Sequence, residues 1–469
     1  MTANRTTPHG LNLENVLDMY CRMTLVNFVI AAGIWRDPQP ELRVDLLALE
    51  RQLVLTMATT LVNDAVPAYT IDLSQPAESR YLQVSQDFGP RMRALTGLFE
   101  EILIAFLPNA LLRQLVIRAA KVSLRRVYDE EEQKELKGIS ESTGVELYLL
   151  VALNNFLDCF LGCTSGAALT RPSAPRHRTT DGSVSEARLM HFRTLDWGMD
   201  ELRDLLVTLE FIDSKKSGKR VLARSVTYVG FVGTLTAVRE GLSLSLNFRP
   251  NHVCTTRSLR WHQFLVLLGR RRSIGSTLRA HVLHRAPRSD STNAIKPSLT
   301  DQAHRLSLVK TSPCYLILCD GVEVTIIEKD LKYGKVRTSD NYMVHTNHDV
   351  DHPITPNPSE YTGSSMLGHE EWLEESTHRK AEFEDKWKRY QQSDQVQAEA
   401  NGAGNSNTAI SASLDATAKV PATPVLESTL RRWVQSKTTM AECTHFACLM
   451  DPVMGQIRWI QRGPAPTLE

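Results

Sequence analysis

Two short stretches decide the fold of this chain, CTSGAAL at 163–169 and HFRTLDW at 191–197. Each reads as a buried strand, and the polar loop 170–185, with a turn at Asp181-Gly182, joins them into a hairpin. The returning strand then runs beside the first, so Arg193 and Asp196 are expected within reach of the Cys163 thiol. A nearby guanidinium favours thiolate, and a carboxylate can orient an amine. A lone cysteine usually only packs in the core, so the combination makes this a candidate site.

Apolar periodicity predicts further elements on both sides of this hairpin. Strands are expected at 66–73, 205–212, 221–235, 242–248, 314–319, 322–327 and 342–346, with a closing hairpin at 444–450 and 456–460. Helices are expected at 41–58, 98–107, 111–127, 138–161, 259–284 and 370–390. The stretch 397–424 is rich in small polar residues without an aromatic, which predicts disorder.

Composition narrows the class of protein. The chain has 469 residues, of which 42% are hydrophobic, and its 54 Lys+Arg and 53 Asp+Glu leave a net charge of +1. This near-neutral balance gives no electrostatic reason to expect a nucleic-acid partner. Eight cysteines without a Cys-x-x-Cys pair favour neither a disulfide scaffold nor structural zinc, and no apolar run approaches the ~18 residues of a membrane span. The polar start lacks a basic region before its apolar stretch, which favours an intracellular protein; a lysosomal or vacuolar location follows if the start is misassigned.

Several ordered motifs resemble the family of acid ceramidase and N-acylethanolamine-hydrolysing acid amidase. The Cys163 and Arg193-to-Asp196 segments resemble the family's Cys-Thr-Ser…Gly-Arg-Asn-x-Asp pattern. Further similar segments are VPAYTIDLSQPAESRY at 66–81, the helix at 138–161, YVGFVGTLT at 228–236, LSLN at 244–247 and YMVHTNHD at 342–349. The resemblance covers roughly residues 60–350 and 430–462, and the shared order of the motifs makes chance agreement improbable.

The resemblance implies an α+β protein with a four-layer α-β-β-α sandwich, the fold of N-terminal-nucleophile hydrolases. It implies a precursor that cleaves itself between Gly162 and Cys163, after which the new α-amine serves as base for its own thiol. Cys163 would attack an amide, Asn347 would donate to the oxyanion, Asp196 would hold the α-amine, and Arg193 would stabilise the thiolate. No cofactor and no metal is implied.

Two positions depart from the family pattern. Phe248 stands where the family has a Glu thought to support self-cleavage. The family's Asp-Asp-Arg-Arg segment corresponds at best to Ser376–Lys380, which makes Arg379 the candidate arginine, 32 residues after Asn347. The expected organisation is an N-terminal extension at 1–60, a helical α part at 61–162, a catalytic β part at 163–352 and 430–462, and a largely disordered insertion with a charged helix at 353–429.

The function expected from the resemblance is hydrolysis of ceramide to a fatty acid and a sphingoid base. Hydrolysis of N-acylethanolamines or other N-acyl amines remains open, as does a non-catalytic lipid-binding relative. Partners are the lipid amide, the α and β fragments of one precursor, and a membrane surface. The membrane contact would use helices 98–107 and 111–127, whose basic residues are Arg113, Arg118, Lys121, Arg125 and Arg126. The alternative is a core helix with a solvated face.

The remaining candidate residues are expected to be structural. Ser225 and Ser245 have no base partner in their sequence context. The pairs Cys159/Cys163 and Cys443/Cys448 lack further ligands at metal-binding spacing, which favours core packing. The histidines beside Asn347, His345 and His348, are likewise expected to be structural.

Overall fold

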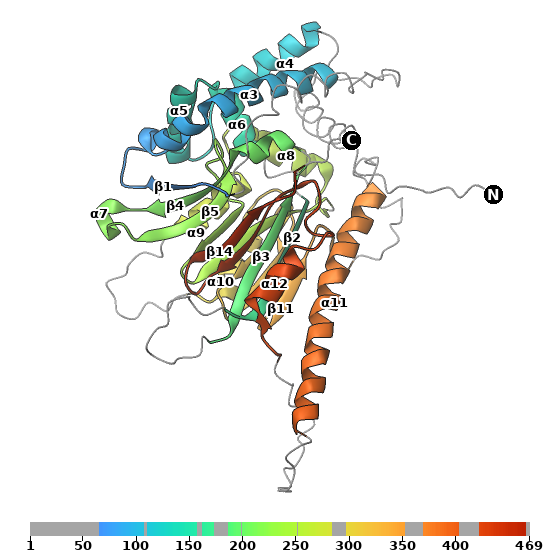
Figure 1. Cartoon of the computed structure of the whole chain (residues 1–469). Coiled ribbons are helices and arrows are strands. Elements are labelled where there is room, and N and C mark those ends of the chain that lie inside the picture. The colour runs from blue at the N-terminus through green and yellow to red at the C-terminus, as the bar shows by residue number, and fades with distance from the viewer. Residues whose placement is uncertain are drawn as a thin grey trace, which may run out of the picture.

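A computed structural model describes residues 65–106, 110–156, 162–172, 186–197, 199–250, 252–283, 297–351, 369–402 and 422–465. The expected extension at 1–60 and residues 353–368 and 403–421 of the expected insertion lie outside these ranges. The described residues form a mixed α+β structure with two sheets (Figure 1). This confirms the expected α+β class and the two packed sheets.

The first sheet has eight strands in the order β1-β4-β5-β6-β7-β8-β9-β10. Its strands are β1 (Ala68–Asp72), β4 (Leu206–Ile212), β5 (Val221–Tyr228), β6 (Thr236–Arg239), β7 (Leu242–Phe248), β8 (Cys314–Cys319), β9 (Val324–Lys329) and β10 (Gly334–Ser339). All six residues of β8 and all six of β9 are buried, as expected for strands covered on both faces. The pair β1–β4 is parallel and the other pairs are antiparallel.

The second sheet carries the hairpin from which the sequence analysis began. Its strands are β2 (Gly162–Arg171), β3 (Arg188–Asp196), β11 (Tyr342–His345), β12 (Val425–Leu426), β13 (Thr444–Asp451) and β14 (Gln456–Arg462). They follow the order β11-β2-β3-β13-β14, with β12 parallel to β2. In the antiparallel β2–β3 pair, Cys163 lies opposite Leu195 and Gly162 opposite Asp196. The predicted hairpin is therefore confirmed, and so is the closing hairpin β13–β14.

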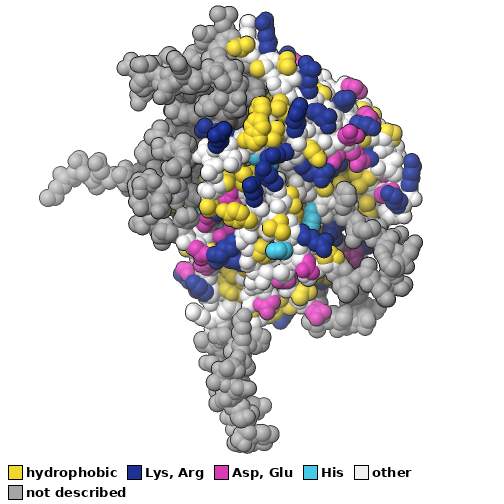
Figure 2. Space-filling model, turned by 180° about the vertical axis from the view of Figure 1, so that it is seen from behind, with side chains coloured by type: hydrophobic (Ala, Val, Ile, Leu, Met, Phe, Trp, Pro, Cys, Tyr) yellow, Lys and Arg dark blue, Asp and Glu magenta, His cyan; other side chains and the backbone are white. Residues whose placement is uncertain are grey.

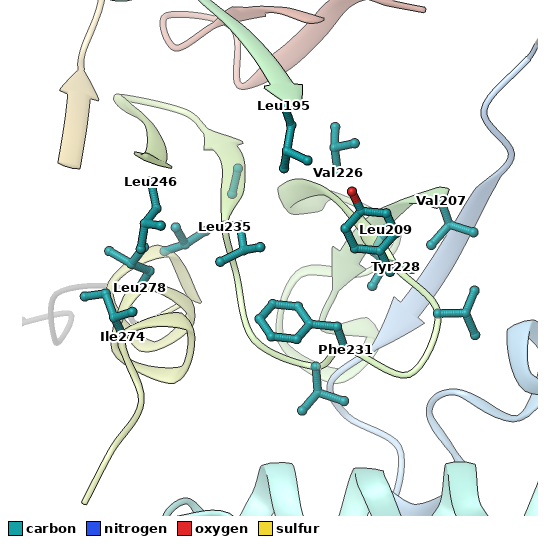
Figure 3. Close-up of a cluster of buried hydrophobic side chains, with 14 of the residues drawn as sticks. Leu195, Val207, Leu209, Val226, Tyr228, Phe231, Leu235, Leu246, Ile274 and Leu278 are labelled. Atoms are coloured by element: carbon teal, nitrogen blue, oxygen red, sulfur yellow. The ribbon is translucent and has the colours of Figure 1, made fainter. Parts of the chain in front are cut away.

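The two sheets pack face to face through apolar side chains. Ala167 and Leu189 of the second sheet share one buried cluster with Tyr315, Ile317 and other residues of the first. A larger cluster joins both sheets to the helices, and Figure 3 shows part of it around Leu195, Tyr228 and Phe231. Burying this much apolar surface is the main stabilising contribution to such a fold.

Helices lie against both sheets (Figure 1). Phe383 of α11 stacks on Phe192 of the second sheet with ring centroids 4.8 Å apart, and α12 packs there through Leu430 and Val434. The other helices include α9, which contacts β5 and β6. The helical segments are η1 (Ala77–Ser79), α3 (Leu82–Phe106), α4 (Ala110–Ser123), α5 (Glu130–Thr143), α6 (Leu147–Phe156), η3 (Asp200–Leu205), α7 (Ser214–Ser217), α8 (Thr256–Leu267), α9 (Ile274–Leu283), α10 (Leu299–Leu308), α11 (His369–Gly402) and α12 (Glu427–Val434).

Two predicted helices are each two helices in the structure. The stretch 138–161 is interrupted at Gly144, which takes the left-handed conformation with φ of 76° and ends α5. Glycine reaches this conformation without a Cβ clash, so the helix stops there and α6 starts afresh. The stretch 259–284 is likewise divided into α8 and α9, with the basic run at 270–272 in the connection.

Other boundaries also differ from the predictions. The strand predicted at 221–235 ends at Tyr228, because the following residues turn before β6 begins. Strand β10 was not predicted, since GKVRTS is half-exposed and polar. The helix α11 runs through Gly402 and so enters the stretch predicted to be disordered, while β12 pairs Val425 with Thr170 just beyond it.

Candidate active site

The thiol of Cys163 lies at the start of β2, buried between the two sheets. Its Sγ is within 3.8 Å of the Leu246 carbonyl oxygen, toward which the S–H group can donate. Burial raises the pKa of this thiol to about 11, and Arg193 is the strongest influence in the opposite direction. A thiol in this environment needs a cation or a base beside it to react as thiolate.

Arg193 of β3 supplies the nearest cation. Its Nη2 donates to Sγ of Cys163 over 3.3 Å, and its side chain is fully buried. Within the described part of the chain, its Nε and Nη1 have no hydrogen-bond partner. Two unused donors on a buried guanidinium are costly, and both remain able to donate to an acceptor.

Asn347, just after β11, contacts the backbone of Cys163. Its Oδ1 accepts from the Cys163 N–H over 2.8 Å, and its Nδ2 donates to the Phe248 carbonyl oxygen over 2.9 Å. Its own N–H donates to Ser376 Oγ of α11 over 2.9 Å. The side-chain oxygen of Asn347 therefore faces the nitrogen that cleavage would turn into an α-amine.

Asp196 and Arg379 form a buried ion pair on the same side of the site. Nη1 of Arg379 lies 2.9 Å from Oδ2 of Asp196 and 3.1 Å from Oγ1 of Thr164, and its Nη2 donates to Asn347 over 3.3 Å. Thr444 donates to the other oxygen of Asp196 over 2.7 Å. Burial raises the pKa of Asp196 to about 6, although Arg379 and Thr444 act to lower it.

All five residues singled out from the sequence thus gather at one place. Arg379 lies on α11 and contacts both Asn347 and Asp196. One contact differs from the expectation that Asp196 holds the nitrogen of Cys163. The described contacts of the Asp196 carboxylate are to Arg379 and Thr444, and Oδ1 of Asn347 is the group bonded to the Cys163 nitrogen.

Ser376, Thr444 and Thr164 also belong to this network, and sequence reasoning did not find them. Ser376 and Arg379 are three residues apart on one helix face, which is the only sequence indication that they act together. His348 contacts Ser376 over 2.9 Å and so fits the structural role expected for it.

Ser245 is a correction to the sequence analysis. Its Oγ lies 2.9 Å from Nε2 of His191, whose Nδ1 lies 2.9 Å from Ser243 Oγ. The serine therefore has a histidine partner, which reaches it from β3 across the space between the sheets. All three side chains are fully buried, and burial lowers the pKa of His191 to about 3. The three residues link the two sheets.

Two kinds of feature were not found in the described part of the chain. No three His, Cys, Asp or Glu side chains gather there in a way that could hold a metal ion, and Cys159 lies outside it. No helix there is long and apolar enough to cross a bilayer.

Comparisons with known proteins point to the family named by the resemblance. A family model described as the beta subunit of N-acylethanolamine-hydrolyzing acid amidase matches residues 64–128. Acid ceramidase from Heterocephalus glaber is 27% identical over 199 residues, and that from Rattus norvegicus is 29% identical over 202. Each match covers 39% of this chain and 46% of the relative, so the chain matches about half the length of these proteins. The solved structure of the Caenorhabditis elegans N-acylethanolamine-hydrolyzing acid amidase ortholog has a TM-score of 0.40 and 16% identity, over 64% of this chain and 100% of that one.

Proposed function

This chain belongs to the family of acid ceramidase and N-acylethanolamine-hydrolysing acid amidase, and from that membership we propose that it is a self-processing cysteine amidase. We attribute the two packed sheets to the four-layer fold of N-terminal-nucleophile hydrolases. The observation that carries the proposal is the pair of contacts at Cys163, from its thiol to Arg193 and from its N–H to Asn347.

The first step is cleavage of the chain before Cys163. Sγ attacks the carbonyl carbon of Gly162, the S–C bond forms, and the C–N bond to Cys163 breaks as the nitrogen takes up the thiol proton. Water then hydrolyses the thioester, which leaves a carboxylate at Gly162 and restores the thiol. Gly162 suits this position because a Cβ there would lie 3.3 Å from the Cβ of Asp196. A larger residue at 162 would press on the Asp196 side chain at its Cβ.

The second step repeats this chemistry on an external amide. The α-amine of Cys163 takes the thiol proton, the thiolate attacks the amide carbonyl, and the amine of the substrate leaves with that proton. Arg193 stabilises the thiolate and polarises the substrate, while Arg379 keeps Asp196 in place. Asn347 would serve both steps. Its Oδ1 already faces the Cys163 nitrogen, and its Nδ2, which donates to the Phe248 carbonyl oxygen in this structure, would donate to the oxyanion during the reaction, a contribution commonly worth ~3 kcal/mol. Water releases the fatty acid from the thioester.

The proposed substrate is ceramide, because the curated relatives that this chain resembles include acid ceramidases. N-acylethanolamine is the alternative, favoured by the family model that matches residues 64–128. Phe248 favours a third candidate, a lipid-binding relative that no longer cleaves itself, since the family Glu is missing there.

A panel of N-acyl lipids offered to the purified full chain tests the proposal. Hydrolysis of ceramide above N-acylethanolamines supports the first substrate, and the reverse order supports the alternative. An intact chain that binds these lipids and hydrolyses none supports the lipid-binding reading. The chain with Cys163→Ala is the matched control, because it differs from the parent only in lacking the nucleophilic sulfur.

We further propose that α4 and the segment after it meet the membrane that holds the substrate. Arg118, Arg125 and Arg126 are exposed there, whereas Lys121 pairs with Glu146; the side chain of Arg113 lies outside the described residues. Basic side chains lie among hydrophobic ones on the face of the molecule seen in Figure 2. Each basic residue near an anionic surface contributes ~1 kcal/mol. Reversing the three charges should weaken activity on vesicle-borne ceramide and spare a short-chain soluble amide; a parallel change in both activities would retire this contact.

A further inference from the structure

Arg249 and Asp349 form a buried ion pair next to the candidate site, and neither has a part in the reaction described above. Nε of Arg249 donates to Oδ1 of Asp349 over 2.8 Å, and its Nη2 donates to Oδ2 over 2.7 Å. The hydroxyl of Tyr315 on β8 donates to the same Oδ1 over 2.7 Å, and Nη1 of Arg249 lies 3.9 Å from Oδ2 of Asp330. Two parallel bonds from one guanidinium hold a carboxylate in a defined geometry.

This ion pair joins the two sheets. Arg249 directly follows Phe248, the last residue of β7 in the first sheet. Asp349 lies shortly after His345, the last residue of β11 in the second sheet. Both residues lie beyond their strand ends, where ladder hydrogen bonds no longer fix the backbone. Side-chain contacts therefore have to hold the two segments together.

Asn347 lies between two such connections. On one side, Nδ2 of Asn247 donates to the carbonyl oxygens of the two residues before Asn347, over 3.1 Å each. On the other side is the ion pair of Arg249 and Asp349. Between them, the Phe248 carbonyl oxygen accepts from Nδ2 of Asn347 over 2.9 Å. The approach of the two segments thus sets the contact that holds the Asn347 side chain.

The Phe248 carbonyl determines which way the Asn347 amide points. A carbonyl oxygen only accepts, so the group that faces it is the NH2 end of the amide. Oδ1 then faces the N–H of Cys163, which donates to it over 2.8 Å. Because the amide is planar, the hydrogen held on Phe248 also fixes the direction of the second Nδ2 hydrogen, which the proposed reaction uses for the oxyanion.

We propose that Arg249, paired with Asp349, is a positioning residue that keeps the Phe248 carbonyl on Asn347. It thereby directs the Asn347 amide both to the Cys163 nitrogen and to the oxyanion. The inference rests on the proposed function, in which Asn347 stabilises the oxyanion. A donor of this kind loses much of its effect when its support is loose by ~1 Å, so a defect in the ion pair should appear in the rate.

Arg249→Lys tests the inference, because it keeps the positive charge and loses the two parallel bonds to Asp349. Hydrolysis should slow roughly tenfold through a lower kcat, with KM unchanged, since the oxyanion exists only after the thiolate attacks. Tyr315→Phe removes one of the bonds to the carboxylate and should slow hydrolysis less, about threefold. An unchanged kcat in Arg249→Lys would overturn the inference.

Arg188→Lys is the matched control. Arg188 forms an ion pair with the buried Asp451 at the other end of β3. That position is ~23 Å along the strand from Leu195, the cross-strand partner of Cys163. The same exchange of arginine for lysine should leave kcat unchanged there. Equal losses of kcat in the two variants would overturn the inference, because any weakened ion pair would then slow the reaction.

A second readout needs neither cleavage nor substrate. The Cys163→Ala chain keeps the N–H at this position, and nuclear magnetic resonance of its isotope-labelled asparagine side chains gives the Asn347 amide signals, identified by their absence after Asn347→Ala. Adding Arg249→Lys should shift these signals and speed the exchange of their hydrogens with water roughly tenfold. Adding Arg188→Lys should change neither.

Unchanged amide signals and exchange after Arg249→Lys would overturn the inference, even if hydrolysis slows. A parent chain that neither cleaves itself nor hydrolyses N-acyl lipids would overturn the proposed function. The amide signals would still decide whether Arg249 positions Asn347, so the two failures are distinguishable.

Discussion

Two buried arginines of this molecule are held in opposite ways. Arg279 of α9 bonds both carboxylate oxygens of Glu135 on α5 and also donates to the Val232 carbonyl over 2.9 Å. Arg193 of β3 is equally buried, but its described hydrogen bond is to the thiol of Cys163, and two of its nitrogens have no partner in the described structure. One guanidinium is fully paired and the other faces a reactive sulfur.

The difference distinguishes an arginine that stabilises the fold from an arginine that serves the reaction. Placing an ion in the interior costs several kcal/mol unless good partners offset it, so Arg279 with Glu135 can be understood as part of the fold. The neighbouring contacts, Asp129 to Arg272 over 2.8 Å and Ser276 to Glu132 over 2.9 Å, extend the same helix-to-helix link. Arg193 brings no such compensation, which is typical of groups kept for function.

The largest expected effect comes from substituting Cys163, the residue that Arg193 contacts. Cys163→Ala should abolish both self-cleavage and hydrolysis, because one sulfur serves both steps. Cys163→Ser should retain slow cleavage and lose most turnover, since an alcohol is far less acidic than a thiol. Gel electrophoresis and the lipid assay measure the two activities. A cleaved, active Cys163→Ala protein would refute the assignment of the nucleophile.

Exchanging each arginine for methionine tests the comparison itself. Arg279→Met leaves the buried Glu135 with Arg80 as its remaining described charge partner, and should lower the free energy of unfolding by about 3–5 kcal/mol. Arg193→Met should leave stability unchanged or higher, because a poorly paired buried charge is removed, while activity is lost. Denaturant unfolding monitored by circular dichroism measures both. Equal destabilisation by the two variants would erase the distinction between them.

Glu132, whose pKa is influenced by Arg279, gives a test of this structural cluster through the pH dependence of stability. Burial raises its pKa to about 7, against the lowering influences of Arg279 and Ser276. Because the folded protein binds this proton more tightly than the unfolded chain, the stability that Glu132 contributes is greatest at low pH and is lost as pH rises from about 4.5 to about 7. Glu132→Gln should remove about 3 kcal/mol of this pH dependence. An unchanged pH dependence of unfolding would contradict the account of Glu132.

The smallest effect is expected from a deletion outside the described residues. Deleting 403–421 should leave folding and activity nearly unchanged, because the segment is poor in core-forming residues and loop length costs little. Thermal unfolding and the lipid assay measure this. Loss of soluble protein on deletion would show that the segment forms part of the core.

Local patterns in the sequence were enough to predict the central strands. The β2–β3 hairpin and β8 were found because apolar residues and turn residues specify such strands within a few positions. The break at Gly144 was missed because a single glycine inside a helical pattern is compatible with either outcome. Strand β10 was missed because its exposed polar residues are held by pairing with β9.

The candidate site was predicted in part. Cys163, Arg193, Asp196, Asn347 and Arg379 were named from motifs, and the structure gathers them. The orientation of Asn347 was not predictable, because it depends on atoms of Cys163, Phe248 and Arg379 that lie far apart in the sequence. The same holds for Thr444, whose contact with Asp196 depends on the pairing of β13 with β3.

The central claim is that Cys163 becomes the N-terminus of a catalytic fragment. Mass spectrometry of the purified full chain, incubated at mildly acidic and at neutral pH, tests it most directly. The account predicts two fragments, one ending at Gly162 and one beginning at Cys163, and hydrolysis of an N-acyl lipid only where both are present. A chain that remains intact under all these conditions and yet hydrolyses the lipid would contradict it.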